Sequence, residues 1–227
     1  HSVQGTAEML ANDLNEKIDN IEYQCAGINH MAFYKKFVKK NKNGDEDLYP
    51  RLKKLADDII NDKKTSTRSA KKDNESNKIL HEKVRYEILK RFGYFVTESS
   101  EHFAEYVPWF IKQNRIDLIE KYKIPIEEYI DRCKNNIKVW DQLEKDMTPI
   151  HKQPLKRSKE YASYIMDAII NNNDITINGN VMNENYIDNL PSNCCVEVPC
   201  LVNSSGNQPL KTGRLPEHLA ALIRTNV

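Results

Sequence analysis

The sequence of 227 residues predicts an α+β fold, in which several helices accompany a small mixed or antiparallel sheet. Through most of the chain, apolar residues recur at the spacing of an α-helix. From residue 174 onward the segments become short and rich in β-branched residues, and Asn, Gly, Pro and Ser separate them. The mean hydropathy is −0.71, but polar residues are concentrated in a few stretches, so the remainder can still form a core.

The beginning of the chain is predicted to contain a helix and then a strand. We expect the helix over residues 6–14, because Thr6 can cap it and apolar residues follow at helical spacing. Residues 21–26 alternate in the manner of a strand that runs into Gly27. An apolar stripe at helical spacing, more typical of a packed core than of a cofactor site, follows at Phe33, Tyr34, Phe37 and Val38.

Residues 61–78 are rich in Lys and contain almost nothing that could be buried, which predicts a mobile surface loop. A basic run can also bind nucleic acid. Here no aromatic residue interrupts the run, and the whole chain has 34 Lys and Arg against 33 Asp and Glu. Composition therefore argues against a nucleic-acid partner.

The remaining elements are predicted from periodicity and from Gly and Pro. Further helical segments are expected over residues 83–92, 101–112, 116–144 and 160–171. Gly93 ends the first of them, Pro108 marks a kink or a helix start in the second, and Pro125 divides the third into two helices. Short strands are expected over residues 174–181, 186–190 and 195–202. A final helix opens near Leu215 and continues through Ile223.

The composition also limits where such a chain is expected to function. No apolar run approaches the ~20 residues that cross a bilayer, so no membrane partner is expected. Five Cys at irregular spacing are a poor disulfide framework and suggest reduced thiols in a cytoplasmic protein. A zinc site at Cys194, Cys195, Cys200 and His218 is disfavoured, because adjacent Cys residues do not suit tetrahedral coordination.

Two residues with useful chemistry have ordinary structural explanations when they are considered without relatives. A single His in an apolar setting, such as His30, is more often a hydrogen-bonded structural residue than a metal ligand, and Asn29 raises the odds only modestly. Tyr94 follows Gly93 in an aromatic run that favours packing, and a Tyr acts as a base only if its pKa falls from about 10. No nucleophile elbow and no glycine-rich phosphate loop occur.

Two runs, His-Ser-Val-Gln-Gly-Thr at residues 1–6 and Gly-Ile-Asn-His-Met-Ala-Phe at 27–33, resemble the melibiase-type alpha-galactosidase branch of glycoside hydrolase family 4. Blocks at 91–102 and 178–200 also resemble this family. The resemblance implies that residues 1–227 are its C-terminal substrate- and metal-binding domain, of the lactate-dehydrogenase-like type and truncated at both ends. It also implies a missing N-terminal Rossmann half that binds NAD, and a metal-binding Cys immediately before His1.

The resemblance assigns roles to particular residues. It implies that His30 is a metal ligand and that Asn29 contacts a substrate hydroxyl. Tyr94 matches the base that removes the proton at sugar C2, and His1 matches a candidate acid for the leaving group. The other residues of the same block, which are implied to orient the sugar or to pack beneath it, are Glu98 and His102, together with Ser99 and Glu101.

In such enzymes NAD oxidises the sugar at C3, a divalent metal such as Mn²⁺ acidifies the C2 proton, elimination follows, and water addition and re-reduction complete hydrolysis. The run His1-Ser2-Val3 favours an unphosphorylated alpha-galactoside over a 6-phospho-glycoside, with glucosides and uronides left open. We expect this chain alone to be inactive and to form a homo-oligomer through its uncovered apolar face. The alternative is a non-catalytic sugar-binding or oligomerisation module derived from such an enzyme.

Overall fold

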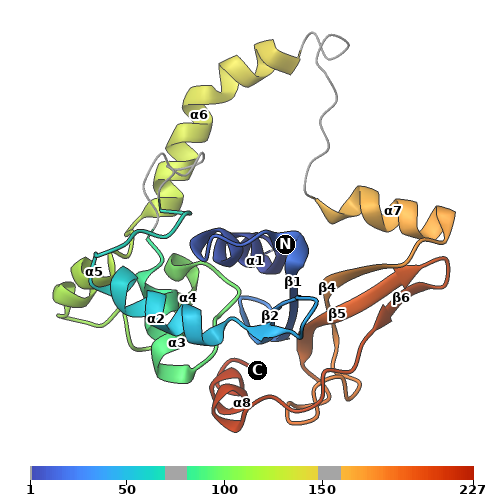
Figure 1. Cartoon of the computed structure of the whole chain (residues 1–227). Helices are drawn as coiled ribbons and strands as arrows, with labels where there is room; N and C mark the ends of the chain where they lie inside the picture. The colour runs from blue at the N-terminus through green and yellow to red at the C-terminus, as the bar shows by residue number, and fades with distance from the viewer. Residues whose placement is uncertain (1, 70–80, 148–159) are drawn as a thin grey trace.

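The computed structural model describes residues 2–69, 81–147 and 160–227, and Figure 1 shows how they are arranged. The described residues form eight α-helices, one short 3₁₀ helix (η1, Ile18–Asn20) and six strands, which confirms the predicted α+β class. His1 and residues 70–78 of the expected loop lie outside the described residues.

The strands form one antiparallel sheet that joins the two ends of the chain. Their bounds are β1 Ile21–Ile28, β2 Met31–Lys39, β3 Glu46–Asp47, β4 Ile175–Met182, β5 Cys195–Asn203 and β6 Gly206–Pro209. The order is β3-β2-β1-β5-β4, and β6 pairs with β5. Gly27 of β1 lies opposite Glu197 of β5, so the N-terminal hairpin and the C-terminal strands meet at the middle of the sheet.

Helices lie on both sides of this sheet, with α1 and α8 on opposite sides of the β1–β2 hairpin in Figure 1. Their bounds are α1 Ser2–Asp13, α2 Tyr49–Ile60, α3 Lys83–Phe92, α4 Ser100–Tyr106, α5 Ile116–Tyr122, α6 Glu128–Met147, α7 Tyr161–Asn171 and α8 Glu217–Ile223. Gly93 ends α3 in the left-handed conformation and donates its N–H to the Leu89 carbonyl, as the sequence predicts.

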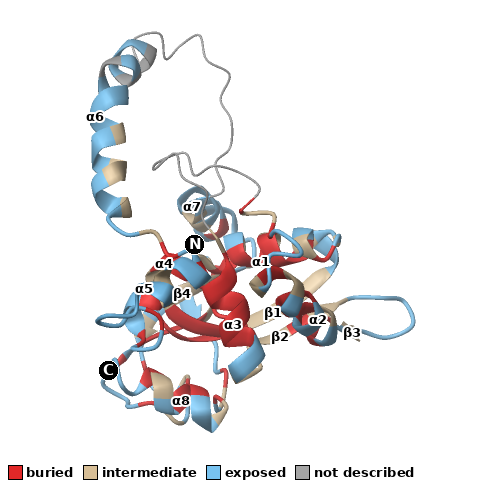
Figure 2. Cartoon of the chain, turned by 90° about the vertical axis from the view of Figure 1, so that its left-hand side faces the viewer, coloured by how far each residue is buried: buried red, intermediate tan, exposed pale blue. Residues whose placement is uncertain are grey.

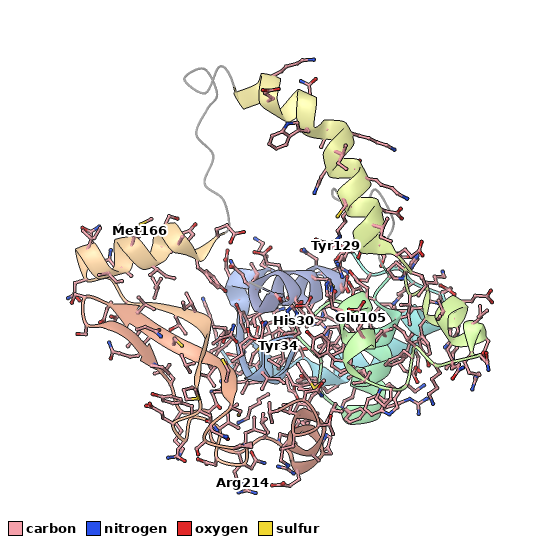
Figure 3. The ribbon with its side chains drawn as sticks, turned by 180° about the vertical axis from the view of Figure 1, so that it is seen from behind. His30, Tyr34, Glu105, Tyr129, Met166 and Arg214 are labelled. Carbon is pink, nitrogen blue, oxygen red and sulfur yellow. The ribbon has the colours of Figure 1, made fainter. Side chains whose placement is uncertain are left out.

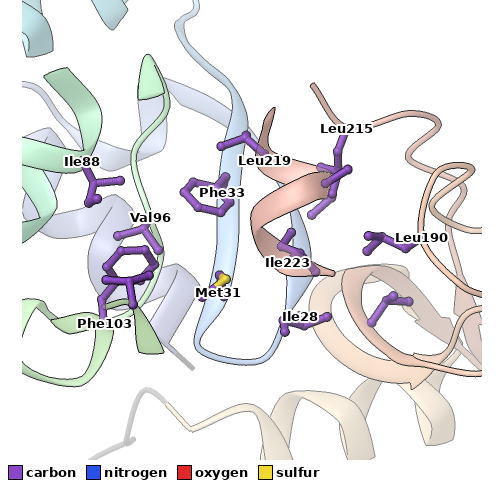
Figure 4. Packing of buried hydrophobic residues seen from close by; sticks show 14 of the residues in the cluster. Ile28, Met31, Phe33, Ile88, Val96, Phe103, Leu190, Leu215, Leu219 and Ile223 are labelled. Atoms are coloured by element: carbon purple, nitrogen blue, oxygen red, sulfur yellow. The ribbon is translucent and has the colours of Figure 1, made fainter. Parts of the chain in front are cut away.

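Alternating residues of the hairpin pack into two different apolar clusters. Ala26 and Phe33 belong to a cluster with α4 and α8, whereas Cys25 and Tyr34 belong to a cluster with α1 and α2. Figure 4 shows the first cluster, in which residues of α8 such as Leu219 face the hairpin. Both faces of the hairpin are therefore fixed by packing.

Helix α3 lies between the two clusters and is the most deeply embedded helix in Figure 2. Val84 and Ile88 pack in the first cluster, and Tyr86 and Leu89 pack in the second. In contrast, α6 extends away from the rest of the molecule and is mostly exposed (Figures 1 and 2). No helix in the described ranges is both long and apolar enough to span a membrane.

The structure corrects four of the sequence predictions. The first helix, α1, begins at Ser2, so Thr6 lies within it and does not cap it. The apolar stripe over residues 33–38 belongs to strand β2, because its side chains serve both clusters rather than one helical face. Residues 186–190 form no strand, and only Ile187 makes an isolated bridge, with Gly213. The helix expected over residues 101–112 ends at Tyr106, since Val107 is extended before Pro108.

The described part of the expected loop over residues 61–78 contacts the body of the protein. Ser66 and Thr67 donate their hydroxyls to the Asp13 carboxylate, and Arg68 pairs with Glu82 and Glu101. The mobility of the loop as a whole stays a prediction.

Gly27 is expected to be essential for the hairpin. A Cβ at this position would lie 2.4 Å from the Met31 carbonyl oxygen and 2.6 Å from the Ala32 Cα, both of them backbone atoms of β2. We expect Gly27→Ala to lower the free energy of unfolding by about 1–3 kcal/mol, measured by urea denaturation. Gly5→Ala is the matched control, because its Cβ meets nothing within 4 Å and Ala favours a helix interior. Equal stability of the two variants would contradict the prediction.

Candidate active site

The turn between β1 and β2 presents His30 at the edge of the sheet. Asn29 and His30 are the two residues of this turn, since Ile28 pairs directly with Met31. His30 has φ 65, in the left-handed region that few residues other than Gly adopt. The packing of both strands holds this conformation, and such held conformations are common at functional sites.

Glu98 binds the imidazole of His30. The Nδ1 atom of His30 lies 2.6 Å from Oε2 of Glu98. Glu98 also accepts hydrogen bonds from the Ser2 hydroxyl at 2.9 Å and from the Ser99 backbone N–H at 2.8 Å. Burial raises the pKa of Glu98. The hydrogen bonds and the nearby His30 together lower it by more than burial raises it, so the pKa of Glu98 is below its usual value. An ionised Glu98 therefore accepts a hydrogen bond from Nδ1–H of His30, which leaves Nε2 available to bind a ligand.

Helix α4 places two further rings against His30. Ser99 caps this helix by accepting the His102 N–H, and its hydroxyl lies 3.0 Å from His102 Nδ1. The rings of His102 and Tyr106, one helical turn apart, lie nearly parallel to the His30 ring, at centroid distances of 5.9 and 5.7 Å. Figure 3 shows His30 between α1 and α4. His30, Glu98, His102 and Tyr106 thus form one centre, which we call the His30 centre.

Three predicted site residues meet at the His30 centre, and Asn29 is next to it. His30, Glu98 and His102 are in contact as described, and Asn29 is exposed at the turn. Glu98, which the resemblance implies to orient the sugar or to pack beneath it, bonds to His30 in the structure. Tyr106 was missed by the sequence analysis, although it follows His102 at i+4 on the predicted helix, and that spacing could have indicated it.

Tyr94 is not brought to the His30 centre. Residues 95–97 run alongside β2, and Tyr94 and Glu98 lie on either side of this segment. The Tyr94 ring contacts Tyr49 and His218 instead. The placement therefore gives no support for Tyr94 acting on the same sugar atoms as His30.

Among the described residues, His30 is suited to be one ligand of a metal site. No group of three His, Cys, Asp or Glu side chains that could hold a metal occurs among residues 2–69, 81–147 and 160–227. His30 alone has the arrangement of a ligand, since a metal-binding His typically donates its other ring nitrogen to a carboxylate. A set of three protein ligands that includes His30 would need residues from outside the described ranges.

Two pockets border the His30 centre. The first, which we call the α1 pocket, has a volume of about 380 Å³ and is lined by Ser2, Arg85, Thr97 and Glu98 among others. The second, which we call the turn pocket, has a volume of about 590 Å³ and includes Asn29 and Tyr106. The α1 pocket adjoins the centre at Glu98, and the turn pocket adjoins it at Tyr106.

Glu197 is a buried carboxyl group near the centre, 6 % exposed on β5. Burial, and then the charge of Glu98, raise its pKa from 4.5 to about 7. Its neutral form is favoured in the folded state, so stability is expected to fall as pH rises from about 4.5 to 7, by roughly 3 kcal/mol. Glu197→Gln should remove this dependence. Urea denaturation between pH 4 and 8 checks the prediction, and parallel pH profiles of the two proteins would contradict it.

Comparisons with known proteins identify the family of the chain. Residues 25–227 match the family 4 glycosyl hydrolase C-terminal domain. The chain is 41 % identical over its whole length to an alpha-galactosidase of Bacillus subtilis strain 168 and 30 % identical to one of Rhizobium meliloti strain 1021. It covers 48 % and 44 % of these proteins, so it spans about half the length of the relatives that it matches.

Solved structures show the same fold. The whole chain superposes on 51 % of a Bacillus subtilis protein assigned as the glucosidase lplD, with a TM-score of 0.76 and 19 % identity. A 6-phospho-alpha-glucosidase from gut microorganisms, solved with NAD and Mn²⁺, gives a TM-score of 0.65 at 15 % identity, over 96 % of this chain and 48 % of that one.

The fold and the domain match together define the chain as the C-terminal domain of a glycoside hydrolase. It belongs to glycoside hydrolase family 4, as the resemblance of its sequence implied.

Proposed function

We propose that the chain is the substrate- and metal-binding part of an alpha-galactosidase that depends on NAD and a divalent metal, Mn²⁺ or a similar ion. The relative with 41 % identity over the whole chain supports the substrate class. The observation that carries the proposal is His30, held at the hairpin turn by the buried carboxylate of Glu98. When bound, NAD supplies a reversible oxidation of the sugar, and the metal supplies a positive charge beside the sugar oxygens.

In this proposal His30 holds the metal through Nε2. Glu98 fixes the orientation and tautomer of the ring, and the hydroxyl of Ser2 and the N–H of Ser99 keep Glu98 itself in place. Asn29 bonds to a sugar hydroxyl from the exposed side of the turn, as the resemblance implied. NAD would bind to the part of the relatives that this chain does not span.

We further propose Tyr106, rather than Tyr94, as the residue that accepts the proton from sugar C2. A general base must lie within hydrogen-bond reach of the proton that it removes, and the metal ligand His30 defines where the sugar lies. The Tyr106 ring is 5.7 Å from the ring of His30, whereas Tyr94 lines a different pocket, with Lys35 and Tyr49. His102 then orients the sugar from the preceding turn of α4.

The test uses this chain fused behind the portion of the Bacillus subtilis relative that lies outside the match, which we call the restored protein. Hydrolysis of p-nitrophenyl alpha-galactoside is measured with NAD⁺, Mn²⁺ and a thiol, for the restored protein and for the chain alone. We expect activity in the restored protein that disappears without NAD⁺ or Mn²⁺, and none in the chain alone. A folded but inactive restored protein would favour the alternative, a non-catalytic sugar-binding or oligomerisation module.

The two tyrosines provide a matched pair in the same assay. We expect Tyr106→Phe to lower kcat by about 10²-fold or more, because general-base catalysis contributes at least that much. Tyr94→Phe removes a hydroxyl from a ring that packs on Tyr49 and His218, and is expected to leave kcat within about threefold. The reverse order would restore the role that the sequence resemblance assigns to Tyr94.

A further inference from the structure

A pocket between the end of α3 and residues 109–122 is not used by the proposed function. This pocket, which we call the α5 pocket, has a volume of about 460 Å³ and is lined by Phe92, Trp109, Lys112 and Lys121 among others. It shares no lining residue with the α1 pocket or the turn pocket, and it includes no residue of the His30 centre. We propose that the α5 pocket binds an aromatic phosphate, a flat ring that carries a phosphate group.

Cationic side chains line the α5 pocket, and in the described part of the chain no carboxylate lines it. Arg91 and Arg115 each pair with a carboxylate close to them in the sequence, at 2.6 and 2.7 Å. Lys112 and Lys121 have no carboxylate partner among the described residues, and the Lys121 ammonium lies 5.0 Å from the centroid of the Tyr122 ring. The pocket therefore keeps the charges of both lysines for a ligand. A phosphate monoester matches them, since it carries a charge of about −1.5 to −2 near pH 7.

One wall of the α5 pocket is aromatic. Trp109 is 36 % exposed, and its ring stacks on that of Phe92 at a centroid distance of 5.3 Å. Phe110 and Tyr122 also line the pocket, and they pack edge to face at 4.9 Å within the first apolar cluster. Packing thus holds the indole of Trp109 in place, and a fixed aromatic ring is a platform on which a flat ligand can stack. The aromatic wall supplies the site for the ring, and the two lysines supply the site for the phosphate.

The size of the α5 pocket limits the ligand. Its volume of about 460 Å³ lies in the lower part of the range of small-molecule pockets, about 300–1,000 Å³. A single flat ring with one phosphate fits this volume better than a dinucleotide does. Lys112 and Lys121 are exposed at the rim, so either can be substituted without disturbing the buried floor of the pocket.

The experiment titrates phenyl phosphate and inorganic phosphate into the restored protein by calorimetry, with NAD⁺ at saturation so that the dinucleotide site is filled. We expect phenyl phosphate to bind at least about 10-fold more tightly than inorganic phosphate, because only phenyl phosphate stacks on Trp109. Lys112→Ala and Lys121→Ala should each weaken the binding of phenyl phosphate by about 10-fold, the effect of losing a hydrogen bond to a charged group. Lys54→Ala is the matched control, since Lys54 is an exposed lysine of α2 that lies outside the α5 pocket. It should leave binding unchanged.

Variants of Trp109 separate the ring from the phosphate. Trp109→Ala should weaken phenyl phosphate by about 10-fold and leave inorganic phosphate unchanged, whereas Trp109→Phe keeps an aromatic face and should restore most of the loss. The proposal is overturned if the folded restored protein does not bind phenyl phosphate, if it binds both phosphates equally, or if neither lysine variant alters binding. The titration needs no turnover, so hydrolysis of p-nitrophenyl alpha-galactoside by the same protein tests the proposed function separately.

Discussion

Replacing Glu82 by Gln is expected to lower the free energy of unfolding by about 3–5 kcal/mol, because it leaves a buried guanidinium without its counter-charge. Glu82 is 1 % exposed and accepts Arg85 Nε at 2.5 Å and Arg68 Nη1 at 2.6 Å. Arg85 is itself 2 % exposed. Burial alone would raise the pKa of Glu82, but the two guanidinium groups outweigh burial and lower it from 4.5 to about 2.

This pKa gives the expected pH dependence. The folded-state pKa lies below the ordinary value, so the contribution of Glu82 is complete above about pH 4.5 and is lost as pH falls toward 2. Urea denaturation at pH 7 and at pH 3 measures both effects. The difference between wild type and Glu82→Gln should be large at pH 7 and smaller at pH 3.

A matched control separates burial from charge. Glu22 pairs with Lys36 and Lys40, but its side chain is 43 % exposed. Water screens such a pair, and Glu22→Gln is expected to cost no more than about 1 kcal/mol. Similar losses for the two variants would show that Glu82 and its arginine partners are not buried in solution as they are in the structure.

The Glu82 network also shows why part of the fold could be predicted from the sequence and part could not. Periodicity and breakers predicted the α3 helix and its end at Gly93, because local spacing determines both. Arg85 pairs with Glu82 at i,i+3 at the start of α3, but Arg68 comes from the segment before it, and nothing in the local pattern links residue 68 to Glu82. The apolar stripe over residues 33–38 indicated a helix where the structure has a strand, for a related reason. Strand β2 is buried on both faces, so it lacks the alternation of a half-exposed strand.

The candidate site, too, could be predicted only in part from the sequence. The resemblance implied roles for His30 in one run and for Glu98 and His102 in another, and the structure brings these three residues together. It did not reveal that Glu98 faces His30, since that contact depends on how residues 95–98 lie along β2. Tyr94 and Tyr106 are both close to Glu98 in the sequence. The segment along β2 ends at Ser99, which caps α4. Helix α4 then brings Tyr106 to the ring of His30, whereas Tyr94 lies before the segment.

The second large effect is expected at His30. If His30 holds the metal in the restored protein, His30→Ala should weaken Mn²⁺ binding by more than the ~10- to 100-fold typical of removing a residue that only orients a ligand. Free Mn²⁺ is measured by EPR during a titration, so the readout does not depend on catalysis. Hydrolysis of p-nitrophenyl alpha-galactoside should fall in parallel, because His30 also defines where the sugar lies.

Glu98→Gln tests the contact that the structure adds. The Gln amide can still bond to Nδ1, but it carries no charge to favour the tautomer that frees Nε2, so we expect Mn²⁺ affinity to fall by about 10- to 100-fold. His218→Ala is the matched control, because His218 is exposed and its Nε2 bonds only to the Phe92 carbonyl at 2.9 Å. The order of loss should be His30→Ala, then Glu98→Gln, with His218→Ala unchanged. If His30→Ala binds Mn²⁺ as wild type does, the turn orients the substrate without the metal. The proposal that His30 holds the metal is then overturned.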